Sequence, residues 1–212
     1  MPARLRPTAP IAADAILVGD PGRALMLAQE LLEQPKMSNH ARGLWGYSGR
    51  TAGGQELTIQ ATGMGGPSAS VVLGDLAELG VRRAIRIGTC ASLGDLDLGE
   101  LLIVTEAHTP GGGRSLPDSE LTAGLERALD GTAGVVVSLD FLHRPEAELP
   151  SMVAEAADMQ TAALLQTAQE QKVATAAVLI ATEKSDSGVL LDEGLEEAGK
   201  RASRAAAALF ST

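Results

Sequence analysis

Short apolar runs that end in glycine-bearing turns alternate with amphipathic helical stretches along this chain, and this alternation is the strongest constraint on its fold. The first run covers residues 15–18 and ends at Gly19, and a helical pattern of apolar residues follows it. The same order recurs around Gly63, and a third run, residues 84–87, ends at Gly88. Buried strands that alternate with helices are typical of an α/β domain. We therefore expect an α/β fold.

The spacing of apolar residues also predicts the other elements. We expect helices after the turns at Gly19 and Gly63 and over residues 121–129, 158–172 and 195–209. We expect further strands over residues 44–49, 56–61, 101–105, 135–137 and 173–181, and an exposed loop over residues 109–119. The second helix would turn Val72, Leu76 and Leu79 inward. No internal repeat or linker interrupts this order, so residues 1–212 are predicted to form a single domain.

The charge balance and the single cysteine exclude several classes of function. The chain has 27 acidic and 17 basic residues, a formal net charge of −10, so we expect no broad attraction to nucleic acid or to an anionic membrane. Cys90 is the single cysteine and the histidines lack zinc-ligand spacing, so neither an intrachain disulfide nor a metal site is expected. The longest apolar run, residues 173–181, is far shorter than the roughly 20 residues that cross a bilayer. We therefore expect a cytoplasmic protein with no nucleic-acid or membrane partner.

Two arginines near the glycine turns indicate an oxyanion site. Arg23 lies in the first turn after Gly19, and Arg86 lies inside an otherwise apolar strand, where a charged residue needs a partner. A guanidinium presents a fork of donors that suits phosphate or carboxylate, and Thr89 adds a hydroxyl three residues later. Ligands gather at the carboxyl ends of strands in open α/β sheets. Taken alone, Arg23 would be assigned as a solvated helix residue, so Arg86 carries this inference.

Other phosphate-binding and hydrolase motifs do not occur in the sequence. Neither glycine cluster has G-x-G-x-x-G spacing in a dinucleotide-binding context, and there is no G-x-x-x-x-G-K-[ST] loop. A G-x-S-x-G nucleophile elbow is also missing, which disfavours a Ser-His-Asp hydrolase.

Five segments carry a family resemblance. They are Gly19-Asp20-Pro21-x-Arg23, residues 42–49 (RGLWGYSG), Gly63-Met64-Gly65-x-Pro67-Ser68, Arg86-Ile87-Gly88-Thr89-Cys90 and Asp158-Met159-Gln160. In this order they resemble the trimeric and hexameric nucleoside phosphorylase family, which includes purine nucleoside phosphorylases and uridine phosphorylases. The resemblance covers most of the chain and implies a three-layer α/β/α nucleoside phosphorylase-type fold with a central mixed, twisted sheet. It also implies that phosphate cleaves a nucleoside, purine in preference to pyrimidine, to the free base and a (deoxy)ribose 1-phosphate.

The resemblance assigns roles to individual residues. Phosphate would be bound by Gly19, Arg23, Arg86 and Thr89, with Arg42 reaching in from a neighbouring subunit. The nucleoside would be bound by Met64, Cys90, Phe141, His143, Asp158, Met159 and Gln160. By its residue type alone, Cys90 indicates a buried, unreactive thiol instead. Inorganic phosphate is the co-substrate, no cofactor is implied, and the assembly would be a dimer or a hexamer built as a trimer of dimers.

The sugar and base side of the expected site departs from the family pattern. Relatives carry a glutamate that accepts both ribose hydroxyls where this chain has Gln160, and a neutral amide loses the stronger charge-assisted bond. Relatives also have an aspartate after the last core strand, and this aspartate is the acid of the reaction. Glu183 falls in that place and Asp186 follows three residues later, so either could protonate the leaving base. The alternatives are a protein that binds nucleoside or phosphate with little turnover and a hydrolytic nucleosidase.

Overall fold

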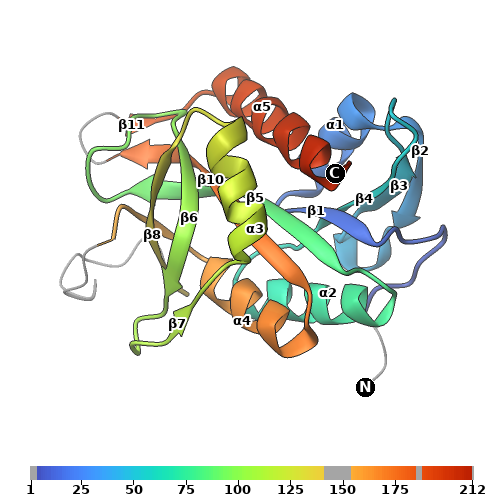
Figure 1. Cartoon of the computed structure of the whole chain (residues 1–212), viewed down its shortest axis with the longest axis horizontal. Coiled ribbons are helices and arrows are strands. Elements are labelled where there is room, and N and C mark those ends of the chain that lie inside the picture. Colours follow the sequence, from blue (N-terminus) through green and yellow to red (C-terminus); the bar gives the residue numbers. More distant parts are fainter. Residues whose placement is uncertain (1–3, 141–153, 185–187, 212) are drawn as a thin grey trace.

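Figure 1 presents the computed structural model of the chain, which describes residues 4–140, 154–184 and 188–211. Its helices are α1 (Pro21–Leu31), α2 (Gly66–Glu78), α3 (Ser119–Ala128), α4 (Thr161–Gln171) and α5 (Asp192–Phe210), with a short turn, η1, at Ala41–Gly43. Its strands are β1 (Asp14–Val18), β2 (Glu33–Asn39), β3 (Gly46–Arg50), β4 (Glu56–Ala61), β5 (Arg83–Ser92), β6 (Leu101–His108), β7 (Arg114–Ser115), β8 (Thr132–Ser138), β9 (Ala156–Asp158), β10 (Ala174–Lys184) and β11 (Gly188–Val189). Within the described ranges, no helix is long and apolar enough to cross a membrane.

The strands of the described residues form one mixed, 11-stranded sheet in which β5 is central. The order is β11-β10-β6-β8-β9-β5-β1-β4-β3-β2, with β7 paired to β6. Strand β5 pairs in parallel with β1 and also with β10, which pairs in turn with β6. Because β6 leads through β8 and β9 back to β5, these strands and β10 close a ring. Strands β1, β4, β3 and β2 continue from the ring as an open sheet.

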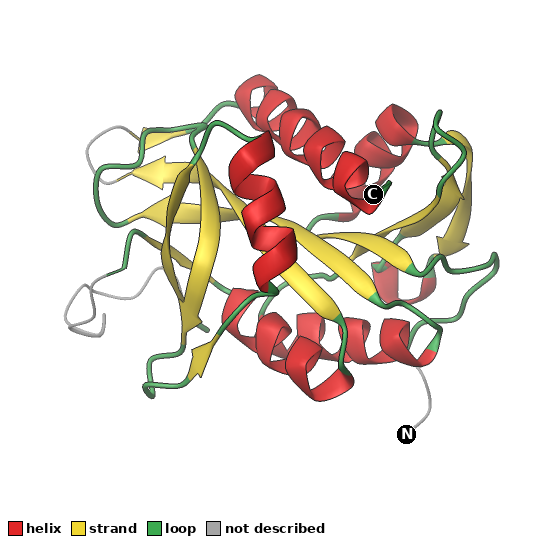
Figure 2. Ribbon diagram, in the orientation of Figure 1, coloured by secondary structure: helices red, strands yellow, loops and turns green. Residues whose placement is uncertain are grey.

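Helices cover both faces of the sheet, which confirms the expected three-layer α/β/α fold. Helices α1, α3 and α5 lie on one face, and α2 and α4 lie on the other (Figures 1 and 2). Alternate residues of β1 follow this division: Ile16 packs in the core under α1, α3 and α5, whereas Leu17 packs in the core under α2 and α4. Adjacent residues of a strand point to opposite faces, so the uninterrupted apolar run of β1 supplies both cores.

Local sequence determines where the two helices after the first glycine turns begin. The Asp20 carboxylate accepts a hydrogen bond of 2.7 Å from Arg23 N at the start of α1, and Pro21 occupies the first helical position. At α2 the residue before the helix is Gly65, whose φ of 79° is a left-handed value that favours glycine. Both helices therefore start directly beyond a strand end, with their amino termini at the same edge of the sheet.

Strand β2 was not predicted, because its residues lack the pattern of a buried strand. The segment EQPKMSN is mostly polar and largely exposed, and it contains Pro35. Proline removes a ladder hydrogen bond and is tolerated at a sheet edge, which is where β2 lies. Tertiary pairing with β3, rather than local preference, makes this segment a strand.

Several element ends also differ from the sequence-based expectations. Strand β5 continues through Gly88 to Ser92, and β10 extends to Lys184, because the two strands pair with each other beyond the glycine. Helix α4 begins at Thr161, and Asp158 instead ends β9. Leu79 does not face inward but ends α2 with 38% of its surface exposed.

Gly88 allows the Arg86 side chain to lie along β5, since the two residues face the same side of the strand. A Cβ at position 88 would lie 2.7 Å from Arg86 Cζ and 2.8 Å from Leu179 Cδ2. We expect Gly88→Ala to lower the free energy of unfolding by about 1–3 kcal/mol, measured by urea denaturation. The control is Gly74→Ala in α2, where an added Cβ meets nothing within 4 Å and should stabilise by about 0.5–1 kcal/mol. Equal stability of the two variants would contradict this prediction.

Candidate active site

The first two glycine turns lie side by side at the carboxyl ends of the parallel strands β1 and β4. Thr62 N donates to Val18 O over 2.7 Å, which joins the two strand ends. A Cβ on Gly19 would come within 3.5 Å of Gly63 O. Strand β5 runs parallel to β1 on its other side. The carboxyl ends of β1, β4 and β5 therefore lie at one edge of the sheet, as the sequence predicted. Proteins of the α/β class bind ligands at this edge.

Arg86 is held in a buried network at this edge. Its side chain is 4% exposed, and its Nη2 donates to Asp158 Oδ2 over 3.0 Å. Its Nη1 donates to Gln160 Oε1 over 2.7 Å, and its Nε donates to Thr161 Oγ1 over 3.1 Å. The buried charge of Arg86 therefore has a partner, Asp158, which belongs to the β9–α4 segment of the same chain.

Asp158 is the carboxylate at the centre of this network and is 1% exposed. Its oxygens accept hydrogen bonds from Ser138 Oγ over 2.5 Å, from Thr161 Oγ1 over 2.6 Å and from Thr161 N over 3.0 Å. The bond from the Thr161 amide satisfies one of the free N–H groups at the start of α4. The buried ion pair is thus surrounded by hydrogen bonds, which is the condition under which a buried pair is tolerated.

Gln160 connects Arg86 to the turn between β4 and α2. Its Oε1 accepts from Arg86 and lies 3.0 Å from Thr62 Oγ1. Its Nε2 donates to Gly63 O over 2.6 Å and approaches Gly65 O at 3.4 Å. The side chain is 3% exposed.

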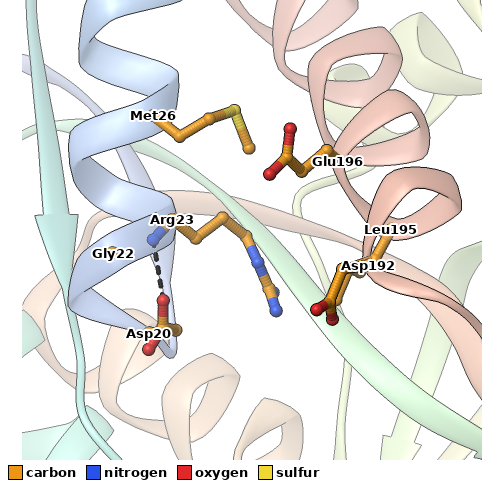
Figure 3. Close-up of a pocket in the computed structure, with 7 residues that line it drawn as sticks. All are labelled: Asp20, Gly22, Arg23, Met26, Asp192, Leu195 and Glu196. Carbon is orange, nitrogen blue, oxygen red and sulfur yellow. Dashed lines mark hydrogen bonds between the residues drawn. The ribbon is translucent and has the colours of Figure 1, made fainter.

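Arg23 faces a pocket between the amino-terminal ends of α1 and α5 (Figure 3). The pocket has a volume of about 230 Å³ and is lined by Asp20, Gly22, Arg23, Met26, Asp192, Leu195 and Glu196. The Arg23 side chain extends from α1 toward Asp192 (Figure 3), yet its guanidinium makes no hydrogen bond or ion pair with any described residue. Burial lowers the pKa of Arg23, the charge of Asp20 opposes that shift, and the charge of Arg86 adds to it. An arginine stays charged in proteins, so Arg23 is a partly desolvated cation that feels the charge of Asp20 but makes no direct ion pair among the described residues.

Helices α1 and α5 run parallel, so both amino termini point to this pocket. Glu30 near the end of α1 forms an ion pair with Arg204, and Met26 Cε lies 3.9 Å from the position of a Cβ on Gly199. Helix amino termini carry partial positive charge that favours an anion. Of the two arginines, Arg23 lines the pocket while Arg86 does not, although they are close enough for their charges to interact. Their joint role in binding phosphate stays a prediction.

Arg42 lies in η1, in a left-handed backbone conformation with φ of 60°, and its side chain is exposed. Asn39, which is fully buried, donates through Nδ2 to Ala41 O over 3.4 Å and to Leu44 O over 2.5 Å. Leu44 Cδ2 lies 3.1 Å from the position of a Cβ on Gly63, so this turn lies beside the β4–α2 turn. The strained backbone therefore presents a charged side chain at the surface next to the candidate site.

The other predicted binding residues differ in exposure. Met64 is 82% exposed on the β4–α2 turn, and Met159 and Thr89 are half-buried. Cys90 is 3% exposed and packs in an apolar cluster, as its residue type indicated. Burial, with a smaller effect from the charge of Asp158, raises the pKa of the Cys90 thiol to about 12.

Of the two candidate acids, the described residues include Glu183. It is half-buried near the end of β10, opposite Ala91 of β5, and its carboxylate has no hydrogen bond or ion pair among the described residues. The other candidate, and the residues expected near the base, lie outside the described ranges: Asp186, Phe141 and His143.

Sequence reasoning missed the residues that complete the site. The side chains of Thr62, Ser138 and Thr161 each contact Gln160, Asp158 or Arg86 of this network. The spacing of three residues from Asp158 to Thr161 was the sequence signal for the bond from Thr161 N at the start of α4. The acidic stretch of residues 192–197 is typical of a solvated helix start, but part of it lines the pocket. No local signal could reveal this, because the contact depends on where α5 packs.

Comparisons with known proteins agree with this arrangement. A family model described as the phosphorylase superfamily matches residues 14–212. A purine nucleoside phosphorylase of DeoD type from Bacillus cereus (strain ZK / E33L) is 30% identical over 190 residues, with 80% of each chain covered. Similar enzymes from Oceanobacillus iheyensis and Caldanaerobacter subterraneus are 39% and 42% identical over 101 residues, so these matches span 47% of this chain and only 43% of each relative.

A solved structure has the same fold. The crystal structure of purine nucleoside phosphorylase from Toxoplasma gondii in complex with immucillin-H superposes with a TM-score of 0.82. The superposition covers 94% of this chain and 92% of that one at 22% sequence identity.

The first prediction from the site concerns the buried ion pair. Replacing Asp158 with alanine leaves the Arg86 charge buried and unpaired, so we expect Asp158→Ala to cost about 3–5 kcal/mol of the free energy of unfolding. The control is Glu56→Ala, which removes an ion pair with Arg50 at 2.7 Å between side chains that are 66% and 63% exposed. Such exposed pairs contribute at most about 1 kcal/mol. Urea denaturation measures both, and a cost at position 158 as small as the control would contradict the prediction.

The second prediction concerns Cys90. Because its pKa is raised to about 12, the thiol stays neutral at pH 8, with a thiolate fraction on the order of 10⁻⁴. We expect no reaction with Ellman's reagent in the native protein at pH 8 and one reactive thiol per chain after denaturation. Rapid labelling of the native protein would show that this part of β5 opens readily or that the thiol is ionised.

Proposed function

The chain belongs to the phosphorylase superfamily, and from that membership we propose that it uses inorganic phosphate to cleave the N-glycosidic bond of a purine nucleoside. The products would be the free base and a pentose 1-phosphate. The relative from Bacillus cereus, which is 30% identical and matches 80% of this chain, is named a purine nucleoside phosphorylase. The chain matches less than half of the length of the relatives from Oceanobacillus iheyensis and Caldanaerobacter subterraneus.

The observation that carries the proposal is the unpartnered guanidinium of Arg23. Among the described residues it has no hydrogen bond, although burial makes its charge costly to leave unpaired. The pocket volume of about 230 Å³ is several times the roughly 30 Å³ that a water molecule occupies in the liquid. A small oxyanion accepts hydrogen bonds from the free N–H groups of this guanidinium, and these directed bonds must outweigh the repulsion from the carboxylates of Asp20, Asp192 and Glu196 in the same pocket.

The proposed reaction needs an anion held against a sugar. One phosphate oxygen forms a bond to the anomeric carbon while the bond from that carbon to the base nitrogen breaks, and the electron pair of the broken bond passes to the base. The sugar carries positive charge in the transition state, as in other glycosyl transfers. A fixed phosphate stabilises this charge, and its position next to the sugar supplies much of the rate.

Arg86 would support the phosphate from inside the protein. Each of its terminal nitrogens carries two hydrogens, and among the described residues one of each is used, in the bonds to Asp158 and Gln160. The second hydrogen of each nitrogen is available to an acceptor. We propose that Thr89 and the turn at Gly19 complete the phosphate site, and that Arg42 enters from a second subunit of a homo-oligomer.

A carboxyl group would protonate the departing base. Glu183 and Asp186 both follow the core of β10, and the Glu183 carboxylate makes no hydrogen bond or ion pair among the described residues. Protonating a purine ring nitrogen makes the base a better leaving group. Phosphate is the co-substrate, and we propose that no further cofactor takes part.

The function is tested by incubating the purified protein with a panel of purine and pyrimidine nucleosides, with and without phosphate. Release of base that requires phosphate, together with formation of the sugar 1-phosphate, is the expected result. Release without phosphate would identify a hydrolytic nucleosidase. Thermal stabilisation by nucleoside without release of base would identify a binding protein, and either outcome would overturn the proposal.

The role of Arg23 predicts a separation of activity from stability. We expect Arg23→Ala to raise the KM for phosphate by about 10–100-fold, since a hydrogen bond to a charged group contributes roughly 1.5–3 kcal/mol. The melting temperature should change little, because the cost of burying the cation and its attraction to Asp20 are removed together. The control is Arg127→Ala on the exposed surface of α3, which should change neither quantity. An unchanged KM for phosphate in Arg23→Ala would remove this residue from the site.

A further inference from the structure

Both ends of the Gln160 amide face polar groups of the protein. Its Oε1 accepts from Arg86 Nη1 at 2.7 Å and lies 3.0 Å from Thr62 Oγ1, whose single hydrogen is shared with Val18 O at 3.0 Å. Both hydrogens of its Nε2 face carbonyl oxygens, of Gly63 at 2.6 Å and of Gly65 at 3.4 Å. An amide has two acceptor sites and two donor hydrogens, and here both ends face protein atoms while the side chain is 3% exposed, so little of it is accessible to a ligand.

The orientation of the amide is determined by its neighbours. Rotating it by 180° would place the NH₂ group against the Arg86 guanidinium and the oxygen against two carbonyl oxygens. Both contacts would be repulsive, and the side chain is 3% exposed, so water could not compensate them. The site therefore requires one end that accepts and one end that donates.

Glutamine meets this requirement and glutamate does not. A carboxylate at position 160 would accept from Arg86, but it has no N–H for the carbonyl oxygens of Gly63 and Gly65. These two glycines have φ values of 73° and 79°, which are left-handed values that favour glycine. The Gln160 amide ties this turn to Arg86.

We propose that Gln160 is a positioning residue, which holds the Gly63–Gly65 turn against Arg86 and makes no hydrogen bond to the sugar of the nucleoside. The resemblance to phosphorylases implied the opposite, an acceptor for sugar hydroxyls. The kinetic consequences rest on the proposed function, whereas the link between Gln160 and the turn does not depend on it.

The test compares wild type with Gln160→Glu and Gln160→Ala, with Gln166→Glu as the matched control. Gln166 lies on the exposed face of α4, so the control makes the same chemical change outside the network. The first measurement is backbone hydrogen exchange. Two amides flank the turn, Thr62 N bonded to Val18 O and Ala69 N bonded to Gly65 O. We expect both variants at position 160 to exchange these amides at least about tenfold faster, while the control does not.

The second measurement is steady-state kinetics with phosphate and with inosine or 2′-deoxyinosine. In Gln160→Glu the new carboxylate partly neutralises Arg86, so the KM for phosphate should rise, by about tenfold or more. The kcat/KM values for the two nucleosides should fall together, with their ratio within about twofold of wild type. If residue 160 bound the sugar hydroxyls, the result would differ. The carboxylate of Gln160→Glu would then strengthen binding of inosine, whose ribose carries the extra hydroxyl.

Two results would overturn the proposal. One is unchanged exchange at Thr62 and Ala69 in both variants at position 160. The other is a shift of about tenfold or more toward inosine in Gln160→Glu. If the wild type cleaves no nucleoside, the proposed function fails, and the exchange measurement alone then decides whether Gln160 holds the turn. Thermal unfolding of each variant checks that it is folded before either measurement.

Discussion

The buried ion pair between Arg86 and Asp158 is the interaction on which the arrangement of the site depends. It joins the central strand β5 to the segment where β9 ends and α4 begins. A buried charge needs a partner and hydrogen bonds to be stable, and here Thr161 and Gln160 supply two acceptors for the guanidinium besides Asp158. Gln160 contacts both Arg86 and the β4–α2 turn, so the hydrogen bonds that stabilise the buried charge also hold this turn beside Arg86. One network thus fixes β5, the β9–α4 segment and the β4–α2 turn relative to one another, although they are distant in the sequence.

The two arginines near the sheet edge serve different purposes. Arg86 forms an ion pair with Asp158, whereas the Arg23 guanidinium makes no direct ion pair among the described residues, although the charge of Asp20 acts on it. Burial and the nearby charge of Arg86 both lower the pKa of Arg23, and each makes an incoming anion more favourable. The carboxylates on α5 work against this attraction, so the pocket should select a ligand that also makes directed hydrogen bonds. The site therefore contains one guanidinium that is paired within the protein, that of Arg86, and one whose N–H groups are free to donate to a ligand, that of Arg23.

The sequence predicted what depends on local pattern and not what depends on long-range packing. The strand at β1, the helices after the turns at Gly19 and Gly63, and the need of Arg86 for a partner all follow from neighbouring residues. The identity of that partner does not, because Asp158 lies 72 residues away and comes close only when β9 pairs with β5. Strand β2 is too polar to be recognised without its neighbour β3, and the contribution of α5 to the pocket depends on its packing beside α1. The resemblance named the phosphate and nucleoside residues, yet it could not reveal that the Gln160 amide is already occupied.

The ring formed by β5, β6, β8, β9 and β10 has a consequence for the order in which the molecule can be assembled. Strand β10 is made late in synthesis but pairs with β5, at the middle of the sheet, and with β6. A nascent chain that has emerged only as far as β9 therefore lacks an interior strand, and the edges of β5 and β6 that it would cover stay open to other chains. Contacts of such large sequence separation also slow folding, because a long loop must close before they form. Nascent chains of this architecture should thus depend on protection from aggregation until β10 has left the ribosome.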